Sequence, residues 1–394
     1  MKIEGKWATN WTPVIDAFIA NFTDAGEQGA GVAIYHRGEL VVNAWAGERS
    51  NRAAGISNQP WDEHTLVNIF SAGKGLVALC VLQLVAQGKL NLDSPIAHYW
   101  PEFSSSEKSA ITVRQILCHR SGLSAFQQQI PNDQIFNWVE MTTVIQTEIP
   151  WWEPNTAQGY SPFIFGWILG ELVRRVSGAQ HFNSYFQTHV AKPLGVNCHF
   201  GVPENLLSGI ADTSPLKHKL SPIGENGADS ASLGKIMKAD PRGVTNRAFS
   251  NPISLMTTTN TSAWRQAQIP AANAHGNAAA LATIYGDLAN DGTLLPADMR
   301  ILCSQQQTFE QDKVLGLPLR FSHGFMLSQA ARVDCRYGRG ANAFGHPGAG
   351  GSVGFADPDF KLGFGYVTQR MGQGLLIDER AVRLIDAAYK VLGT

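Results

Sequence analysis

The stretch from Leu76 to Gln87 constrains the fold most, because nearly every position in it is apolar. A helix that is apolar around its whole circumference has to be buried. Ser71 and Lys74 lie directly before this stretch, and their spacing of three residues puts both side chains on one face of a helical segment. The sequence therefore predicts a serine at the N-terminus of a buried helix, with a lysine one turn behind it.

This pair of side chains suits nucleophilic catalysis. A serine hydroxyl is a poor nucleophile until a base takes its proton. Lys74 can act as that base if burial and nearby positive charge lower its pKa from about 10.4. The helix N-terminus also offers free backbone N–H groups to a developing oxyanion. The alternative is a capping serine and a surface lysine, but a lysine bounded by a wholly apolar helix has no obvious route to solvent.

Two further segments contain residue types that such a site uses. Tyr160 lies in a loop before a predicted helix over 163–176, where its hydroxyl can point into a cleft; the alternative is a packed loop aromatic. The segment Gly345–Ser352 contains four glycines and precedes a predicted strand. Glycines there permit close approach of the backbone to a ligand, and the alternative is a flexible turn.

Both ends of the chain are predicted to supply helices and antiparallel strands. The predicted helices cover 13–24 and 377–392, and the predicted strands cover 31–35, 40–46, 352–356 and 363–368. The periodicity between them is mostly helical. We therefore predict an α+β fold of the α/β sandwich type. Residues 1–71 and 296–394 form a domain with a central antiparallel sheet flanked by helices, 72–295 form an inserted helix-rich region, and the catalytic cleft lies between the two.

Charge and cysteine content argue against several classes of protein. Lys and Arg total 31 and Asp and Glu total 32, so neither a nucleic acid nor a membrane is the indicated partner. The five cysteines are widely spaced, which argues against a disulfide framework or a zinc site. No signal peptide or membrane span is apparent. We expect a cytoplasmic protein with a small-molecule substrate, no cofactor and no metal; its oligomeric state is left open.

The order of these motifs resembles the serine β-lactamase and penicillin-binding-protein superfamily, and most closely the family VIII carboxylesterases, which are similar to class C β-lactamases. Further segments resemble the same superfamily, namely 89–95, 99–103, 116–123, 152–156, 269–273 and 279–292. The last two resemble the esterase branch in particular. The likeness covers nearly the whole chain and implies a β-lactamase/transpeptidase-like fold.

The resemblance implies a role for each motif. Ser71 is the implied nucleophile, and Lys74 and Tyr160 share the work of general base and general acid. The backbone N–H groups of Ser71 and Ala349 form the implied oxyanion hole. The implied substrate-binding residues are His346, Gly348 and Gly350.

Two positions depart from the superfamily. Its Tyr-x-Asn is Tyr160-Ser161-Pro162 here, and the Lys-Thr-Gly of the lactamases is His346-Pro347-Gly348. An asparagine amide and a fixed lysine for a drug's carboxylate are therefore missing, and both losses favour ester over β-lactam chemistry. The histidine can contact substrate or the tyrosine, and a loop histidine without such a role is the alternative.

Because proline fixes its own φ, the tyrosine loop is expected to be stiff. We expect it to hold the Tyr160 hydroxyl within hydrogen-bond reach of both Ser71 and Lys74.

Three other motifs are rejected. Ser352 lies in a G-x-S-x-G pattern, but the α/β-hydrolase order requires a later histidine, and the last one is His346. The Gly73–Gly75 segment lacks the other residues of a P-loop. Cys198 and His199 have no partner at metal-ligand spacing.

We therefore predict a serine hydrolase that cleaves short-chain carboxylic esters through a Ser71 acyl-enzyme. The alternatives on the same site are an acyltransferase and a β-lactamase or D-alanyl-D-alanine peptidase. A non-enzymatic alternative is a catalytically silent ligand-binding protein of this fold. The presence of Ser71, Lys74 and Tyr160 together argues against that last alternative.

Overall fold

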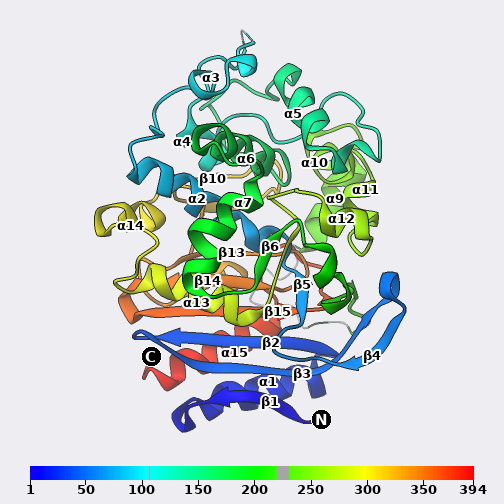
Figure 1. Cartoon of the computed structure of the whole chain (residues 1–394), viewed down its shortest axis with the longest axis vertical. Helices are drawn as coiled ribbons and strands as arrows, with labels where there is room; N and C mark the ends of the chain where they lie inside the picture. The colour runs from blue at the N-terminus through cyan, green and yellow to red at the C-terminus, as the bar shows by residue number, and fades with distance from the viewer. Residues whose placement is uncertain (106, 219, 221–229) are drawn as a thin grey trace.

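A large antiparallel sheet forms the base of the molecule in the computed structural model, which describes residues 1–394 except 106, 219 and 221–229 (Figure 1). Its strands are β1 Ile3–Trp7, β2 Gly29–His36, β3 Glu39–Asn51, β4 Ile56–Pro60, β10 Thr308–Gln311, β11 Pro318–Phe321, β12 Met326–Leu327, β13 Phe344–Pro347, β14 Val353–Asp357 and β15 Leu362–Thr368. Their order is β1-β3-β2-β15-β14-β13-β12-β11-β10, with β4 paired to β3. Each adjacent pair is antiparallel.

The two ends of the chain meet in this sheet, where β2 pairs with β15 and Ile34 lies opposite Phe364. Successive side chains of a strand point to opposite faces. Ile34 therefore joins the core that holds α1 (Thr12–Asp24) and α15 (Glu379–Val391), whereas its neighbour Ala33 joins the core that holds α13 (Ala278–Ala289). The helices α1 and α15 pack against each other beside both termini (Figure 1).

The close packing of α13 on the sheet depends on glycines of β15. A Cβ atom at Gly365 would lie 2.2 Å from the carbonyl oxygen of Ala278, so no larger residue fits there without a shift of the helix. This contact brings α13 onto β2, β14 and β15.

Helices and a small sheet form the rest of the molecule. The helices are α2 Lys74–Ala86, α3 Ile96–Tyr99, α4 Val113–Leu117, α5 Trp138–Thr147, α6 Ile164–Ser177, α7 Phe182–Phe186, α8 Lys192–Leu194, α9 Ser230–Ala239, α10 Val244–Ser250, α11 Ser254–Thr257, α12 Ser262–Gln266 and α14 Ala297–Ser304. The small sheet has the order β6-β9-β5-β7, with bounds Cys198–Phe200, Ala274–Gly276, Leu66–Asn68 and Ile210–Ala211. A further two-stranded sheet joins β8 (Ser214–Pro215) to β16 (Arg370–Met371).

The predicted terminal helices and strands are confirmed, with shifts of a few residues at their ends. The connection between the last two predicted strands contains a short 3-10 helix, Pro358–Phe360. The proposed division at residues 71 and 295 stays a prediction. The mostly helical periodicity between the termini agrees with α13, but it could not show that this helix packs on the sheet.

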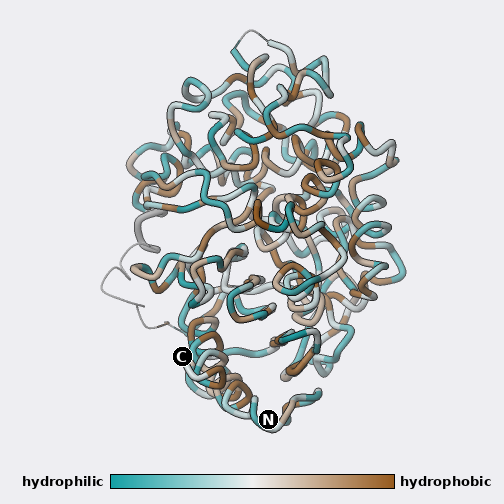
Figure 2. The backbone as a smooth tube through the Cα atoms, turned by 90° about the vertical axis from the view of Figure 1, so that its left-hand side faces the viewer, coloured by the Kyte–Doolittle hydropathy of each residue, from teal (hydrophilic) through white to brown (hydrophobic). Residues whose placement is uncertain are grey.

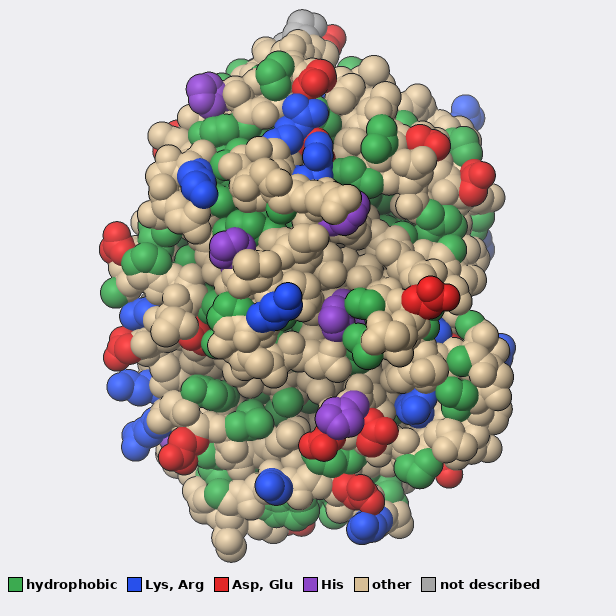
Figure 3. Space-filling model, viewed as in Figure 1, with side chains coloured by type: hydrophobic (Ala, Val, Ile, Leu, Met, Phe, Trp, Pro, Cys, Tyr) green, Lys and Arg blue, Asp and Glu red, His purple; other side chains and the backbone are tan. Residues whose placement is uncertain are grey.

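The protein surface carries charges of both signs, as the nearly equal numbers of basic and acidic residues predict. Hydrophobic and hydrophilic stretches alternate along the backbone (Figure 2), and charged side chains of both signs are scattered over the face shown in Figure 3. None of the described helices is long and apolar enough to cross a membrane.

Candidate active site

A strand-to-helix turn presents Ser71. The strand β5 ends at Asn68, and a 3-10 turn over Phe70–Gly73 leads into α2. Two hydrogen bonds fix this turn: the Ile69 N–H donates to the Ala274 carbonyl at 2.8 Å, and the Phe70 N–H donates to the Asn68 side chain at 3.1 Å. Ser71 thus lies one short turn before the α-helix, which begins at Lys74.

The helix α2 is buried as its sequence predicts. Every residue from Lys74 to Leu84 is buried, and Lys74 itself is 0% exposed. Ser71 does not act as a helix cap either, because no side-chain hydrogen bond caps the start of the 3-10 turn or of α2. The alternative of a surface lysine is therefore wrong.

The contacts of the Lys74 ammonium group are all uncharged. Its Nζ lies 3.0 Å from Ser71 Oγ and donates to the carbonyl oxygens of Pro162 at 2.7 Å and Ala271 at 2.8 Å. Burial lowers the Lys74 pKa well below its usual value. A neutral amine has two hydrogens and one lone pair. When the amine is neutral and both hydrogens bind these carbonyls, its lone pair is free to accept the Ser71 hydroxyl proton.

Packing around the Ala271 carbonyl holds this arrangement in place. The Asn273 side chain accepts from the Ile269 N–H at 2.9 Å and donates to the carbonyl of Ala267 at 2.6 Å, which fixes the segment on either side. Gly166 of α6 packs so closely that a Cβ atom there would lie 2.2 Å from the Ala271 nitrogen. The segment 269–273 was recognisable by resemblance, but nothing in its sequence indicated that a carbonyl would bind the lysine.

Tyr160 lies against the same two side chains. It is 4% exposed, and Lys74 Nζ lies 4.9 Å from its ring centroid. Burial raises the Tyr160 pKa above its usual value, and a side-chain hydrogen bond with Ser71 acts in the opposite direction. The expected contact with Ser71 is therefore present. The expected hydrogen bond to Lys74 is not among those of the described residues: the amine lies over the ring, because carbonyls accept its hydrogens.

Two buried side chains that the sequence reasoning did not single out fix the tyrosine loop. The Asp312 carboxylate accepts the Tyr160 N–H at 2.8 Å and the N–H groups of Val314 and Leu315 at 2.9 Å. His119 Nδ1 accepts the Ser161 N–H at 3.1 Å. His119 lay in a segment quoted for its resemblance, whereas Asp312 had no motif around it.

The glycine-rich segment lies directly against the nucleophile turn. A Cβ atom at Gly348 would lie 2.2 Å from the Ile69 carbonyl oxygen, so this approach requires glycine. Arg380, which is fully buried, donates to the Gly350 carbonyl at 2.7 Å and holds the far side of the segment. Within the part of the chain that the structure describes, the backbone N–H groups of Ser71 and Ala349 have no internal acceptor. Both are therefore available to an oxyanion.

His346 is buried and has a defined tautomer. Its ring is 1% exposed, and its Nδ1 lies 2.7 Å from the Pro347 carbonyl oxygen, an acceptor that requires Nδ1 to carry the proton. Burial, with a smaller contribution from Lys74, lowers its pKa to about 3. The ring centroid lies 5.9 Å from that of Tyr160. His346 is thus a neutral side chain beside the tyrosine.

A cavity of about 160 Å³ opens at these residues. Ser71, Tyr160, His346 and Ala349 line it, together with mostly apolar side chains from 249–272 and 315–376. Among the residues that the structure describes, no Lys, Arg, Asp or Glu lines the cavity. A substrate bound here meets one hydroxyl nucleophile in apolar surroundings.

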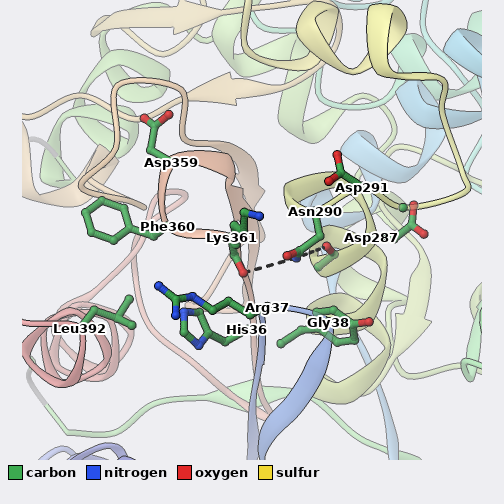
Figure 4. A pocket seen from close by; sticks show the side chains of 13 residues that line it. His36, Arg37, Gly38, Asp287, Asn290, Asp291, Asp359, Phe360, Lys361 and Leu392 are labelled. Carbon is green, nitrogen blue, oxygen red and sulfur yellow. Dashed lines mark hydrogen bonds between the residues drawn. The ribbon is translucent and has the colours of Figure 1, made fainter.

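A larger hollow of about 820 Å³ lies elsewhere, at the β2–β3 turn and the C-terminal end of α13 (Figure 4). Charged side chains of both signs line it, including Arg37, Lys361 and Asp291. It contains none of the predicted site residues. Asp287 in its wall accepts the backbone N–H groups of Thr293 and Leu294 and so stabilises the chain locally.

The rejected motifs have structural roles. Ser352 is 2% exposed, and its hydroxyl accepts the Thr368 N–H at 3.3 Å. His199 lies 2.8 Å from the Asn197 side-chain oxygen. In the described ranges no group of three or more His, Cys, Asp or Glu residues is placed to hold a metal ion.

Comparisons with known proteins agree with this geometry. A family model described as beta-lactamase matches residues 15–387. The chain belongs to the β-lactamase family. A family VIII carboxylesterase of known structure is 34% identical, with a TM-score of 0.87 over 99% of this chain and 100% of that one. A penicillin-binding protein homolog from Caulobacter crescentus is 31% identical, with a TM-score of 0.86 over 99% of this chain and 100% of that one.

The esterase/beta-lactamase LipL of Mycobacterium tuberculosis is 27% identical over 378 residues, which are 93% of this chain and 83% of LipL. The predicted superfamily and its β-lactamase/transpeptidase-like fold are therefore confirmed.

Proposed function

We propose that this β-lactamase family member is a serine carboxylesterase that hydrolyses short, uncharged esters through a Ser71 acyl-enzyme. The decisive observation is the buried Lys74 side chain, whose Nζ lies 3.0 Å from Ser71 Oγ and donates to two carbonyl oxygens, next to an apolar cavity that Ser71 lines. The predicted class, a serine hydrolase acting on esters, is confirmed by the family and its esterase relatives. The roles of the residues and the size of the ester belong to the proposal.

In the first half of the reaction, Ser71 Oγ attacks the ester carbonyl carbon while Lys74 Nζ takes the hydroxyl proton. The negative charge that develops on the carbonyl oxygen is stabilised by the N–H groups of Ser71 and Ala349, since preformed donors are most effective at such a charge. Collapse of the tetrahedral intermediate breaks the bond to the alcohol. Tyr160 donates its proton to the leaving oxygen, and the proton held by Lys74 returns to Tyr160 through a water molecule, because the two groups share no hydrogen bond among those of the described residues.

The second half reverses these proton transfers. A water molecule donates a proton to Lys74, which is neutral again after the first half, as its oxygen attacks the acyl carbon. When the bond to Ser71 Oγ breaks, the proton returns to that oxygen. The products are a carboxylic acid and the free serine, so no other group is consumed.

The cavity limits the substrate. The described part of its lining includes no cation for a carboxylate and no anion for an ammonium group. Its volume of about 160 Å³ is close to that of an engineered apolar cavity of about 150 Å³ that binds benzene. We therefore propose an uncharged small molecule whose buried part is about that size.

A substrate panel tests this proposal. We expect a higher kcat/KM for p-nitrophenyl acetate or butyrate than for a chromogenic cephalosporin, by at least about tenfold, because an unpaired carboxylate in an apolar site is costly. The Ser71→Ala variant measures the background hydrolysis. A higher kcat/KM for the cephalosporin would contradict the proposal and favour the β-lactamase alternative.

The Tyr160→Phe variant tests the proton relay. The change removes one oxygen from a packed ring, so we expect the fold to persist and kcat to fall about 100-fold or more, the range of general acid–base catalysis. KM should change less. Retention of more than a tenth of the wild-type kcat with an aliphatic ester, whose poor leaving group needs a proton, would remove Tyr160 from the mechanism.

A cytoplasmic location is a further part of the proposal. It is supported by five cysteines that are all buried and unbridged, as is common in reducing compartments.

A further inference from the structure

Two side chains that line the cavity, those of Trp264 and His346, each have a buried polar atom without a hydrogen-bond partner among the described residues, and His346 is the one whose ring lies beside Tyr160. His346 is 1% exposed and lines the cavity beside Ser71 and Tyr160. Its Nε2 is buried and has no hydrogen-bond partner among the described residues. A buried polar atom that lacks its hydrogen bond costs roughly 1–3 kcal/mol, so a group that supplies the bond gains affinity.

The tautomer decides what kind of group that is. Nδ1 carries the proton, because its neighbour at 2.7 Å is a carbonyl oxygen, which can only accept. In a neutral imidazole the other nitrogen is then an acceptor. Nε2 therefore requires a donor, an O–H or an N–H. A lysine at this position, as in the Lys-Thr-Gly of the lactamases, would do the opposite, because its ammonium group donates hydrogen bonds to an anion.

The neighbours of His346 indicate which part of the substrate it meets. Its ring centroid lies 5.9 Å from that of Tyr160, and under the proposed function Tyr160 protonates the leaving alcohol. The chain continues from the end of β13 into Gly348 and Ala349, and the Ala349 N–H is a proposed donor to the ester carbonyl oxygen. The alcohol portion of the ester is therefore the portion nearest to Nε2. Among the described residues, the Tyr160 hydroxyl makes no hydrogen bond to Nε2.

We propose that His346 Nε2 accepts a hydrogen bond from a hydroxyl or N–H group in the alcohol portion of the ester, which makes it a specificity-determining residue for monoesters of diols and similar alcohols. This inference rests on the proposed esterase function. It adds a substrate feature that the apolar lining alone does not require.

Two esters with the same acyl group test the proposal. 2-Hydroxyethyl butyrate offers the donor, and 2-methoxyethyl butyrate has the same oxygen with its hydrogen replaced by a methyl group. The two leaving alcohols are similar in acidity. We expect the wild-type kcat/KM to favour the hydroxyethyl ester about 5- to 150-fold, which corresponds to about 1–3 kcal/mol. Equal kcat/KM values would overturn the proposal.

The variant His346→Phe keeps a flat ring and removes the acceptor. In it the ratio of the two kcat/KM values should fall to less than about threefold, because both esters then meet the same ring without an acceptor. If this variant does not fold, His346→Gln, which retains an acceptor on a flexible chain, should show an intermediate preference. An unchanged preference in either folded variant would assign the discrimination to another group.

Activity on p-nitrophenyl butyrate distinguishes a failure of this proposal from a failure of the proposed esterase function. Hydrolysis of that ester without any preference between the glycol esters contradicts only the role of His346. Absence of Ser71-dependent hydrolysis of all three esters contradicts the esterase function itself.

Discussion

Replacement of Ser71 by alanine should lower kcat for ester hydrolysis by about a million-fold, the loss found when the nucleophile of a serine hydrolase is removed. The change deletes one oxygen atom, whose partners are Lys74 and Tyr160. The backbone N–H of residue 71 remains, so the proposed oxyanion hole is unaffected. We therefore expect the circular dichroism spectrum and the thermal midpoint to change little.

Ser352→Ala is the matched control, because Ser352 is the other serine in a motif typical of hydrolases. Its hydroxyl accepts one backbone N–H in the sheet, so this variant should lose roughly 1–3 kcal/mol of stability at most and keep most of its activity. A fluorophosphonate probe should label the wild type and Ser352→Ala but not Ser71→Ala. Labelling of a folded Ser71→Ala protein would refute the assignment of the nucleophile.

The parts of the site that the sequence predicted are local in the chain. Ser71 and Lys74 share a face because they are three residues apart, and the burial of α2 follows from its apolar residues alone. The terminal strands follow from alternation and turn residues. Such patterns do not depend on which distant segment packs against them.

The parts that were missed depend on long-range contacts. The Ala271 carbonyl reaches Lys74 across 197 residues of sequence, and Asp312 reaches the Tyr160 N–H across 152. Asp312 stands between Gln311 and Lys313, in a stretch that is polar like any surface turn. Its complete burial becomes visible only when the backbone N–H groups of three other residues converge on its carboxylate.

The second large effect is expected at Lys74. Lys74→Arg keeps a positive charge, but a guanidinium stays protonated and cannot act as a base. We expect kcat to fall by about 100- to 10,000-fold, the usual contribution of a general base. Because arginine is also larger than lysine, Lys74→Met serves as a second variant that fits the same buried space. Near-wild-type activity in Lys74→Arg would show that Lys74 supplies charge only.

The pH dependence of stability tests the protonation state of Lys74 independently of catalysis. Burial places its folded-state pKa well below the unfolded value of about 10.4. Between these two values the unfolded chain binds one proton more than the native protein, so the free energy of unfolding rises with pH across this window. Lys74→Met has no such proton to lose. Relative to that variant, the wild type should therefore gain stability as the pH rises above the folded-state pKa of Lys74, up to about pH 10 and no further. A difference that does not vary with pH over this range would mean that the amine remains charged in the folded protein, and Lys74 could not take the proton from Ser71.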